Sequence, residues 1–241
     1  MKVSRFYQKS EMKAGDELEL STANHRHAIQ VLRLKLDQAL ILFNGEDGEY
    51  LAKLIYSDKR NSRVLLEKFD PISRESHLST TLALAMIKPD KMDFAIQKSV
   101  EMGISTLQPI YTKRSVIKIK ANRLDKKMQH WQGVIIAACE QSGRTRIPDL
   151  HEPLGLEKFL DQSTESNCIA MFPGDHPKIE ELKSRENLSL LIGPEGGFTD
   201  DEEEIMLQKG VSPISFGSRI LRAETAVIAG LTACQQLWGD L

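Results

Sequence analysis

The chain has 241 residues, enough for one large domain or two smaller ones with their own hydrophobic cores. Its net charge of −2 argues against a general binder of polyanions, and no apolar run reaches the length of a membrane span. Met1–Tyr7 also lacks the apolar core of a signal peptide. These features predict a cytoplasmic protein that has no membrane partner.

Cysteines and histidines show no pattern that would suit a metal ion or a disulfide framework. The three cysteines are odd in number, far apart and set among apolar residues: Cys139, Cys168 and Cys234. We therefore expect buried free thiols in a reducing compartment, and no metal.

The first seventy residues are dominated by strand patterns. The strand-like segments are residues 38–44, 49–57 and 63–69, with the turn Gly45-Glu46-Asp47-Gly48 between the first two. Residues 22–34 instead place apolar side chains on one face of a helix, with Thr22 or Asn24 as the N-cap. Short strands with one helix predict a small β-barrel over residues 1–72.

After a polar linker at residues 71–76, the pattern changes to alternating strands and helices. The strands are expected at residues 80–87, 104–111, 168–172, 188–192 and 213–216, and the helices at 91–102, 124–141, 177–184, 200–209 and 223–238. Asp90 is the expected N-cap of the first of these helices, and Gly103 its stop. The alternation predicts an α/β domain, residues 73–241, whose largely parallel sheet is covered by helices.

Two loops follow the last two strands, and each leads into a helix. The first reads Gly193-Pro194-Glu195-Gly196-Gly197-Phe198-Thr199, and the second reads Ser215-Phe216-Gly217-Ser218-Arg219-Ile220-Leu221-Arg222. Because the carboxyl ends of strands bind ligands in open α/β sheets, these loops predict one pocket built from main-chain groups and short side chains. An ordinary tight turn is the alternative for the first loop. Acids at 200–202 already have a structural role, because Thr199 and Glu202 can form a capping box.

Polar side chains stand at the ends of two otherwise apolar helices. The helix 223–238 is apolar nearly all round, so we expect it to be deeply buried and its polar start to face a site. That start carries Arg222, Glu224 and Thr225, and an Arg222–Glu224 ion pair is the alternative. Glu140 and Arg144 flank the end of the helix 124–141, where ordinary capping is the alternative.

Several common catalytic motifs are missing from the chain. It has no phosphate-binding loop, dinucleotide fingerprint, nucleophile elbow, HExxH or CxxC. Local clusters of basic residues are present instead. They contain Arg26, His27, Arg33 and Lys35; the run from Lys113 and Arg114 to Lys127; and Arg144 with Arg146. Phosphate contacts need concentrated charge, so these clusters predict a nucleic-acid face, with a solvated surface as the alternative for each.

The segments GPEGGFTDDEEE (193–204) and FGSRILRAETA (216–226) closely resemble the RsmE family of 16S rRNA (uracil(1498)-N3)-methyltransferases, in the SPOUT superfamily. The resemblance extends to MKVSRFY (1–7), HAIQVLRLK (27–35), FNGEDGEY (43–50), KMDFAIQKSVEMG (91–103) and EQSGR (140–144). It therefore spans both expected domains.

This resemblance implies a PUA-like RNA-binding barrel and a C-terminal SPOUT domain with a deep trefoil knot. It implies a homodimer that binds S-adenosylmethionine (SAM) and acts on 16S rRNA in the 30S subunit. The implied SAM-binding residues are Met171, Phe172, Pro173, Ile192, Gly193, Pro194, Glu195, Gly196, Gly197, Ile220, Leu221, Arg222, Thr225 and Ala226. RNA-binding residues are expected at Arg5, Arg26, His27, Arg33, Lys35, Lys113 and Arg114.

For the chemistry, we assign Arg222 to stabilise the uracil anion, with Glu140 or Arg144 next in line for substrate positioning or proton handling. Two alternatives stay open. One is a SPOUT methyltransferase acting on another RNA, such as tRNA. The other is a PUA-type RNA-binding assembly factor without catalytic activity.

Overall fold

The structure is a computed structural model that describes residues 3–46, 48–163 and 167–241. The chain divides into two compact units. The N-terminal unit contains Met1–Glu75 and Cys139–Ile147, and the C-terminal unit contains Ser76–Ala138 and Pro148–Leu241. One long helix, α3 (Ala121–Ser142), contributes residues to both units. The domain boundary after residue 72 stays a prediction.

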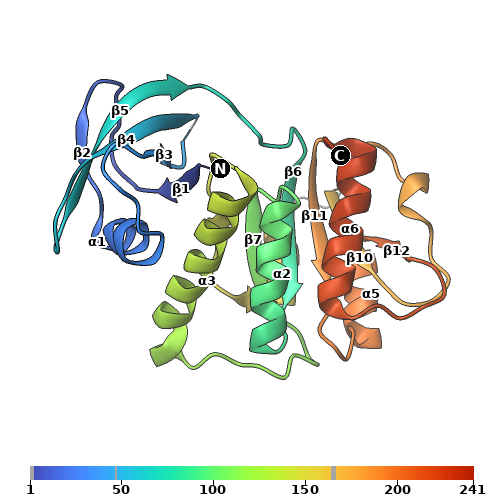
Figure 1. The fold of residues 1–241 in the computed structure, drawn as a ribbon. Helices are drawn as coiled ribbons and strands as arrows, with labels where there is room; N and C mark the ends of the chain where they lie inside the picture. The colour runs from blue at the N-terminus through green and yellow to red at the C-terminus, as the bar shows by residue number, and fades with distance from the viewer. Residues whose placement is uncertain (1–2, 47, 164–166) are drawn as a thin grey trace. The chain divides into compact units, whose positions relative to one another are not determined.

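The N-terminal unit is built on a five-stranded sheet in the order β1-β3-β4-β5-β2 (Figure 1). Its strands are β1 (Ser4–Tyr7), β2 (Glu17–Glu19), β3 (Ala39–Phe43), β4 (Glu49–Ser57) and β5 (Ser62–Asp70). β1 pairs with β3 in parallel, and the other pairs are antiparallel. Alternate side chains of the strands, such as Phe6, Leu42 and Leu54, form the core of this unit. The three predicted strands are confirmed. Of the predicted turn between β3 and β4, Asp47 lies outside the described residues.

The helix predicted over residues 22–34 is shorter and less regular than expected. α1 (Thr22–His25) continues directly into a π-helical turn, Arg26–Val31. Ser21 is the N-cap, and its hydroxyl accepts a hydrogen bond from the Asn24 N–H at 3.2 Å. The assignment of the cap to Thr22 or Asn24 was therefore wrong by one position or more.

The C-terminal unit contains a parallel sheet in the order β12-β10-β11-β6-β7-β8, with β9 also pairing with β7. Its strands are β6 (Ser79–Ala85), β7 (Thr106–Tyr111), β8 (Asp149–Leu150), β9 (Leu154–Gly155), β10 (Cys168–Met171), β11 (Asn187–Ile192) and β12 (Ser212–Ile214). The prediction of a largely parallel sheet is confirmed.

Helices cover this sheet on both faces. They are α2 (Pro89–Glu101), α4 (Leu156–Gln162), α5 (Asp200–Gln208) and α6 (Ala223–Trp238), with the Ala121–Ala138 part of α3. α4 and α5 pack on the face that Ala83 and Ala85 present, and α2 and α6 lie side by side in front of the sheet in Figure 1. Both faces of β6 are thus buried from Leu82 to Ala85, which explains the continuous apolar sequence of this part of the strand.

Three details of the predicted helices need correction. Lys88, not Asp90, is the N-cap of α2, because Pro89 occupies the first helical position, where its missing N–H costs nothing. A helix at 177–184 was wrong, since only a 3₁₀ turn, Ile179–Glu181, forms there. The seven-residue α4 was not predicted.

All three cysteines are buried and free, as expected, and burial raises the pKa of Cys139 to about 12. None of the described helices is long and apolar enough to cross a membrane.

A buried ionic cluster in the N-terminal unit generates a prediction about pH. Glu49 is paired with Arg5 and, at 3.1 Å, with Arg74. Burial alone would raise the pKa of the Glu49 carboxyl, but hydrogen bonds and charges from both arginines outweigh it and lower the pKa below 4.5. A lowered pKa means that this contribution is present above pH 4.5 and is lost as pH falls through the folded-state value.

We therefore expect Glu49→Gln to lower stability by about 2 kcal/mol at pH 7, with the difference from wild type shrinking in acid. Denaturant unfolding at pH 7 and at acid pH measures both values. The matched control is Glu17→Gln, which removes an exposed pair with Arg63 and should change little. A difference that stays constant with pH would contradict the account.

Helix α6 generates a second prediction, because it packs closely on the sheet at Gly230. A Cβ at this position would lie 2.9 Å from both Leu190 Cδ2 and Met171 Sδ. We expect Gly230→Ala to cost about 1–3 kcal/mol through overpacking. Gly133→Ala on α3 is the control, since a Cβ there meets nothing within 4 Å, and it should gain about 0.5–1 kcal/mol of helix propensity. Equal melting temperatures for the two variants would be inconsistent with this packing.

Candidate functional site

A cavity opens where β10, β11 and β12 end, within the C-terminal unit. The space that its walls surround is about 680 Å³, which includes open solvent at the mouth. Eleven of the predicted SAM-binding residues line it: Met171, Phe172, Pro173, Ile192, Gly193, Pro194, Glu195, Gly197, Ile220, Leu221 and Ala226. Five further lining residues were not predicted: Phe198, Phe216, Gly217, Arg219 and Ala223. All five lie within the two loop motifs or directly after them, so the motifs already contained the signal for them.

Three predicted residues, Gly196, Arg222 and Thr225, are not among those that line the cavity. All three are exposed. The assignment of these three residues to SAM stays a prediction.

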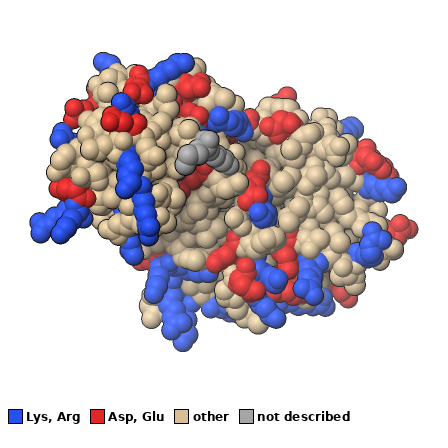
Figure 2. Space-filling view, in the orientation of Figure 1, with Lys and Arg blue, Asp and Glu red and all other residues tan. Residues whose placement is uncertain are grey.

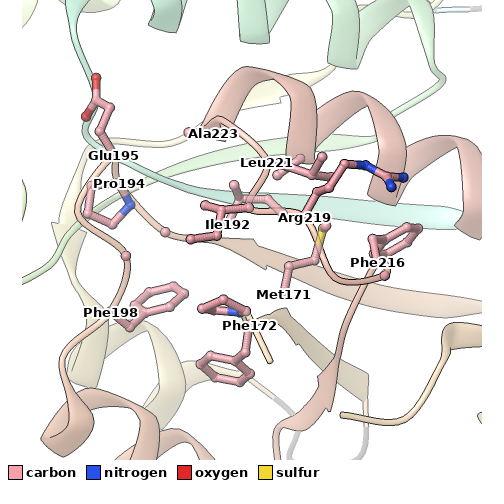
Figure 3. Close-up of a pocket in the computed structure, with 16 residues that line it drawn as sticks. Met171, Phe172, Ile192, Pro194, Glu195, Phe198, Phe216, Arg219, Leu221 and Ala223 are labelled. Carbon is pink, nitrogen blue, oxygen red and sulfur yellow. The ribbon is translucent and has the colours of Figure 1, made fainter. Parts of the chain in front are cut away.

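The walls of the cavity are mostly apolar. Figure 3 shows Phe172 and Phe198 on one side of Met171 and Ile192, with Leu221 on the other. The two phenylalanine rings meet edge to face, with centroids 5.8 Å apart. Such walls suit a flat, largely uncharged group, whose polar edges main-chain groups could bind.

The first loop, residues 193–199, makes a tight turn that forms one wall. Gly197 adopts a φ of 69°, and its N–H donates to the Pro194 carbonyl at 2.9 Å. A Cβ on Gly193 would lie 3.2 Å from ring carbons of Phe198. Glycine is thus needed both for the turn and for the approach of this ring. The first loop is therefore both a tight turn and a wall of the cavity.

Hydrogen bonds from neighbouring segments hold the first loop in place. The predicted capping box is confirmed, with the Glu202 carboxylate accepting from the Thr199 N–H at 2.9 Å. The Glu195 carboxylate points away from the cavity in Figure 3 and accepts from the Lys88 N–H at 3.1 Å. Arg114 donates to two carbonyls of the loop.

Contrary to what its sequence predicts, α6 is not buried on all sides. One face is buried, but Thr225 is exposed and Leu237 is 44% exposed. Arg222 is the N-cap residue, and its carbonyl accepts from the Ala226 N–H at 2.8 Å. Glu224 pairs with Lys91 at 3.3 Å, so the acid of the suggested Arg222–Glu224 pair has another partner.

Two predicted site residues of the N-terminal unit, Arg5 and Arg144, have partners inside it. Arg5 pairs with Glu49 and donates to the carbonyls of Gly143 and Arg144 at 3.1 and 3.0 Å. The Arg144 side chain is buried and binds Glu75, with its Nε 2.9 Å from the carboxylate. Residues 74 and 75, in the expected linker, are thus tied into this unit.

The Glu140 carboxylate accepts a hydrogen bond from the Tyr7 N–H at 2.9 Å. Burial raises the pKa of this carboxyl, although the Tyr7 N–H and the positive charge of Arg5 act in the opposite direction. A raised pKa makes the carboxylate a better proton acceptor than an ordinary glutamate.

The predicted RNA ligands differ in how free their side chains are. Arg26, His27, Arg33 and Lys35 are exposed. Lys113, by contrast, pairs with Asp201 at 2.6 Å. On the face shown in Figure 2, Lys and Arg side chains lie among Asp and Glu over much of the surface. No group of three or more potential metal ligands gathers anywhere in the described part of the chain.

Comparisons with known proteins match this architecture. A family model described as an RNA methyltransferase domain matches residues 74–235, and an RNA methyltransferase PUA domain matches residues 20–67. A ribosomal RNA small subunit methyltransferase E from Buchnera aphidicola is 34% identical over 242 residues, covering 100% of this chain and 98% of the relative. The enzyme of that name from Rickettsia conorii is 34% identical over 98% of this chain and 97% of its own.

Two solved structures are similar over their whole length. A putative methyltransferase from Legionella pneumophila, in complex with SAM, has a TM-score of 0.97 at 36% identity and covers 100% of both chains. A ribosomal RNA small subunit methyltransferase E from Neisseria gonorrhoeae, bound to SAM, has a TM-score of 0.93 at 32% identity and covers 99% of both chains.

The loops that form the cavity, the PUA domain and the full-length similarity all agree. The chain belongs to the RNA methyltransferase family, among the ribosomal RNA small subunit methyltransferases E.

Proposed function

We propose that the chain transfers a methyl group from SAM to N3 of uridine 1498 of 16S rRNA in the 30S subunit. The observation that carries this proposal is the cavity between three strand ends, in a chain whose 32% identical Neisseria relative binds SAM. The family resemblance supplies the choice of nucleotide.

The residues of the cavity fit SAM. Apolar side chains such as Met171, Ile192 and Leu221 offer a surface for a flat base, and the glycines of the first loop leave main-chain groups accessible for its polar edge. Bound SAM supplies a methyl group on a sulfonium, so the chain needs no covalent nucleophile. This agrees with the absence of a nucleophile elbow from the sequence.

The chain's own residues must orient the uracil and handle the proton that leaves N3. We assign Arg222 to stabilise the negative charge that develops on the uracil carbonyls. Glu140, whose pKa is raised by burial, is our candidate for proton handling, and Arg144 for substrate positioning. Alignment of the two reactants supplies much of the remaining acceleration.

The proposal extends to the assembly and the RNA contacts. We assign the exposed Arg26, His27, Arg33 and Lys35 to RNA binding, together with Lys113. Two other predicted RNA ligands have partners within the fold, since Arg5 pairs with Glu49 and Arg114 donates to carbonyls of the first loop. A deep knot is part of the proposal because the family resemblance implies it. The family resemblance implies a homodimer, and cytoplasm is where the substrate occurs.

The direct test supplies labelled SAM and the purified chain to 30S subunits, free 16S rRNA and tRNA from a strain that lacks the enzyme. We expect label in 16S rRNA only, as N3-methyluridine in hydrolysed nucleosides. Label in tRNA alone would favour the alternative RNA substrate. SAM binding without any methyl transfer would favour the non-catalytic assembly factor.

The role of Arg222 is tested against Arg219, the cation that lines the cavity. We expect Arg222→Ala to lower kcat by about 10²–10³-fold, the scale for removing one charge-stabilising donor, with little change in SAM affinity. Arg219→Ala should lower kcat less, and Arg222→Lys should recover part of the loss. The reverse order of the two alanine variants would assign the role to Arg219.

A further inference from the structure

Arg114 is the residue whose contacts the proposed function has not used. It follows β7, and its Nη1 donates to the carbonyls of Gly196 at 2.9 Å and Phe198 at 2.7 Å. Both carbonyls belong to the first loop. Hydrogen bonds from a charged guanidinium to carbonyl oxygens are stronger than neutral ones, so this one side chain can hold two points of the loop.

The two peptide groups that Arg114 holds are also held from their other ends. The Gly196–Gly197 peptide donates its N–H to the Pro194 carbonyl at 2.9 Å. The Phe198–Thr199 peptide donates its N–H to the Glu202 carboxylate at 2.9 Å. With a bond at each end, each peptide plane is fixed in orientation. Gly197 and Phe198 lie between these two planes, so the planes restrict the backbone direction at Phe198.

The segment that carries Arg114 is itself anchored to the same carboxylate. The Lys113 N–H donates to the other oxygen of Glu202 at 2.7 Å, and Glu202 is only 4% exposed. The Thr112 N–H donates to the Ser115 hydroxyl at 3.1 Å, which closes the turn. The backbone on both sides of Arg114 is therefore held in place, as is required of a residue that positions another group.

The consequence reaches the cavity through Phe198. Its ring lines the cavity, meets Phe172 edge to face and packs where Gly193 has no Cβ. The bond to the Gly196 carbonyl is exposed and the bond to the Phe198 carbonyl is partly buried. Removal of the Arg114 side chain would open both carbonyls to water, so the fold would lose little. The loop, however, would lose the bonds that fix the Phe198 backbone, and binding would then have to order it.

We propose that Arg114 is a positioning residue that pre-organises the first loop for SAM, rather than primarily a ligand of RNA phosphate. The inference rests on the proposed function, because it takes the cavity to be the SAM site. It changes the proposed role of Arg114 within the basic run 113–127 from RNA binding to positioning of the loop. The other basic residues of the run remain candidates for RNA binding.

The test compares Arg114→Ala with wild type by calorimetric titration of SAM and by steady-state kinetics. We expect the Kd and KM for SAM to rise about tenfold, which corresponds to about 1.4 kcal/mol, while kcat at saturating SAM changes less than threefold. The melting temperature should stay within about two degrees of wild type. Arg114→Lys, which can donate to one carbonyl at a time, should recover part of the affinity. The control is Lys209→Ala, which removes an equally charged side chain paired with Asp161 at 2.9 Å in the same unit, and should leave SAM affinity unchanged.

RNA binding at several salt concentrations separates this role from phosphate binding. We expect Arg114→Ala to leave the salt dependence of RNA affinity unchanged. A SAM affinity within twofold of wild type, or a flatter salt dependence with unchanged SAM affinity, would overturn the inference. Failure of the wild-type chain to bind SAM would instead contradict the proposed function, and it is measured before any variant is compared.

Discussion

The parallel pairing of β10 with both β11 and β12 is the constraint on which the site depends. Parallel neighbours end at the same edge of a sheet, so the chain after Met171, Ile192 and Ile214 must leave from one place. The loops that follow have to share that space, and bare glycines with small or apolar side chains let them do so. A cavity lined by three separate stretches of sequence results directly from the strand order.

Some charged side chains stabilise the fold through paired contacts, and others are exposed and available to a substrate. Few charged side chains line the cavity, and one of them, Glu195, is turned away to bind the Lys88 N–H. In the N-terminal unit, Arg5 pairs with the buried Glu49 and the buried Arg144 pairs with the half-buried Glu75, whereas Arg26, Arg33 and Lys35 are exposed. A buried, paired guanidinium would have to give up its partner to bind phosphate, which costs far more than using an exposed one. The exposed cations are therefore the better candidates for RNA contact.

Much of the fold follows from local patterns in the chain. The strands β3, β4 and β5 and the bounds of α6 could be predicted because each has a full period of apolar residues and clear end signals. β1, β2 and α4 are too short to show a period, and their partners decide that they form. Most of the cavity residues lie in or beside the two loop motifs, whereas Met171–Pro173 were expected only from the family resemblance. Arg114 was expected to bind RNA, and its contacts with the first loop could not be predicted, because a side chain that reaches across 82 residues to the Gly196 carbonyl leaves no local pattern.

The central claim is that three loops at one sheet edge form the SAM site, and a crystal structure of the chain with SAM tests it most directly. The account predicts density for SAM between Met171–Pro173, the first loop and the second loop, with Phe198 and Arg114 in the positions described above. Density for SAM at any other place on the chain, with this cavity empty, would contradict it.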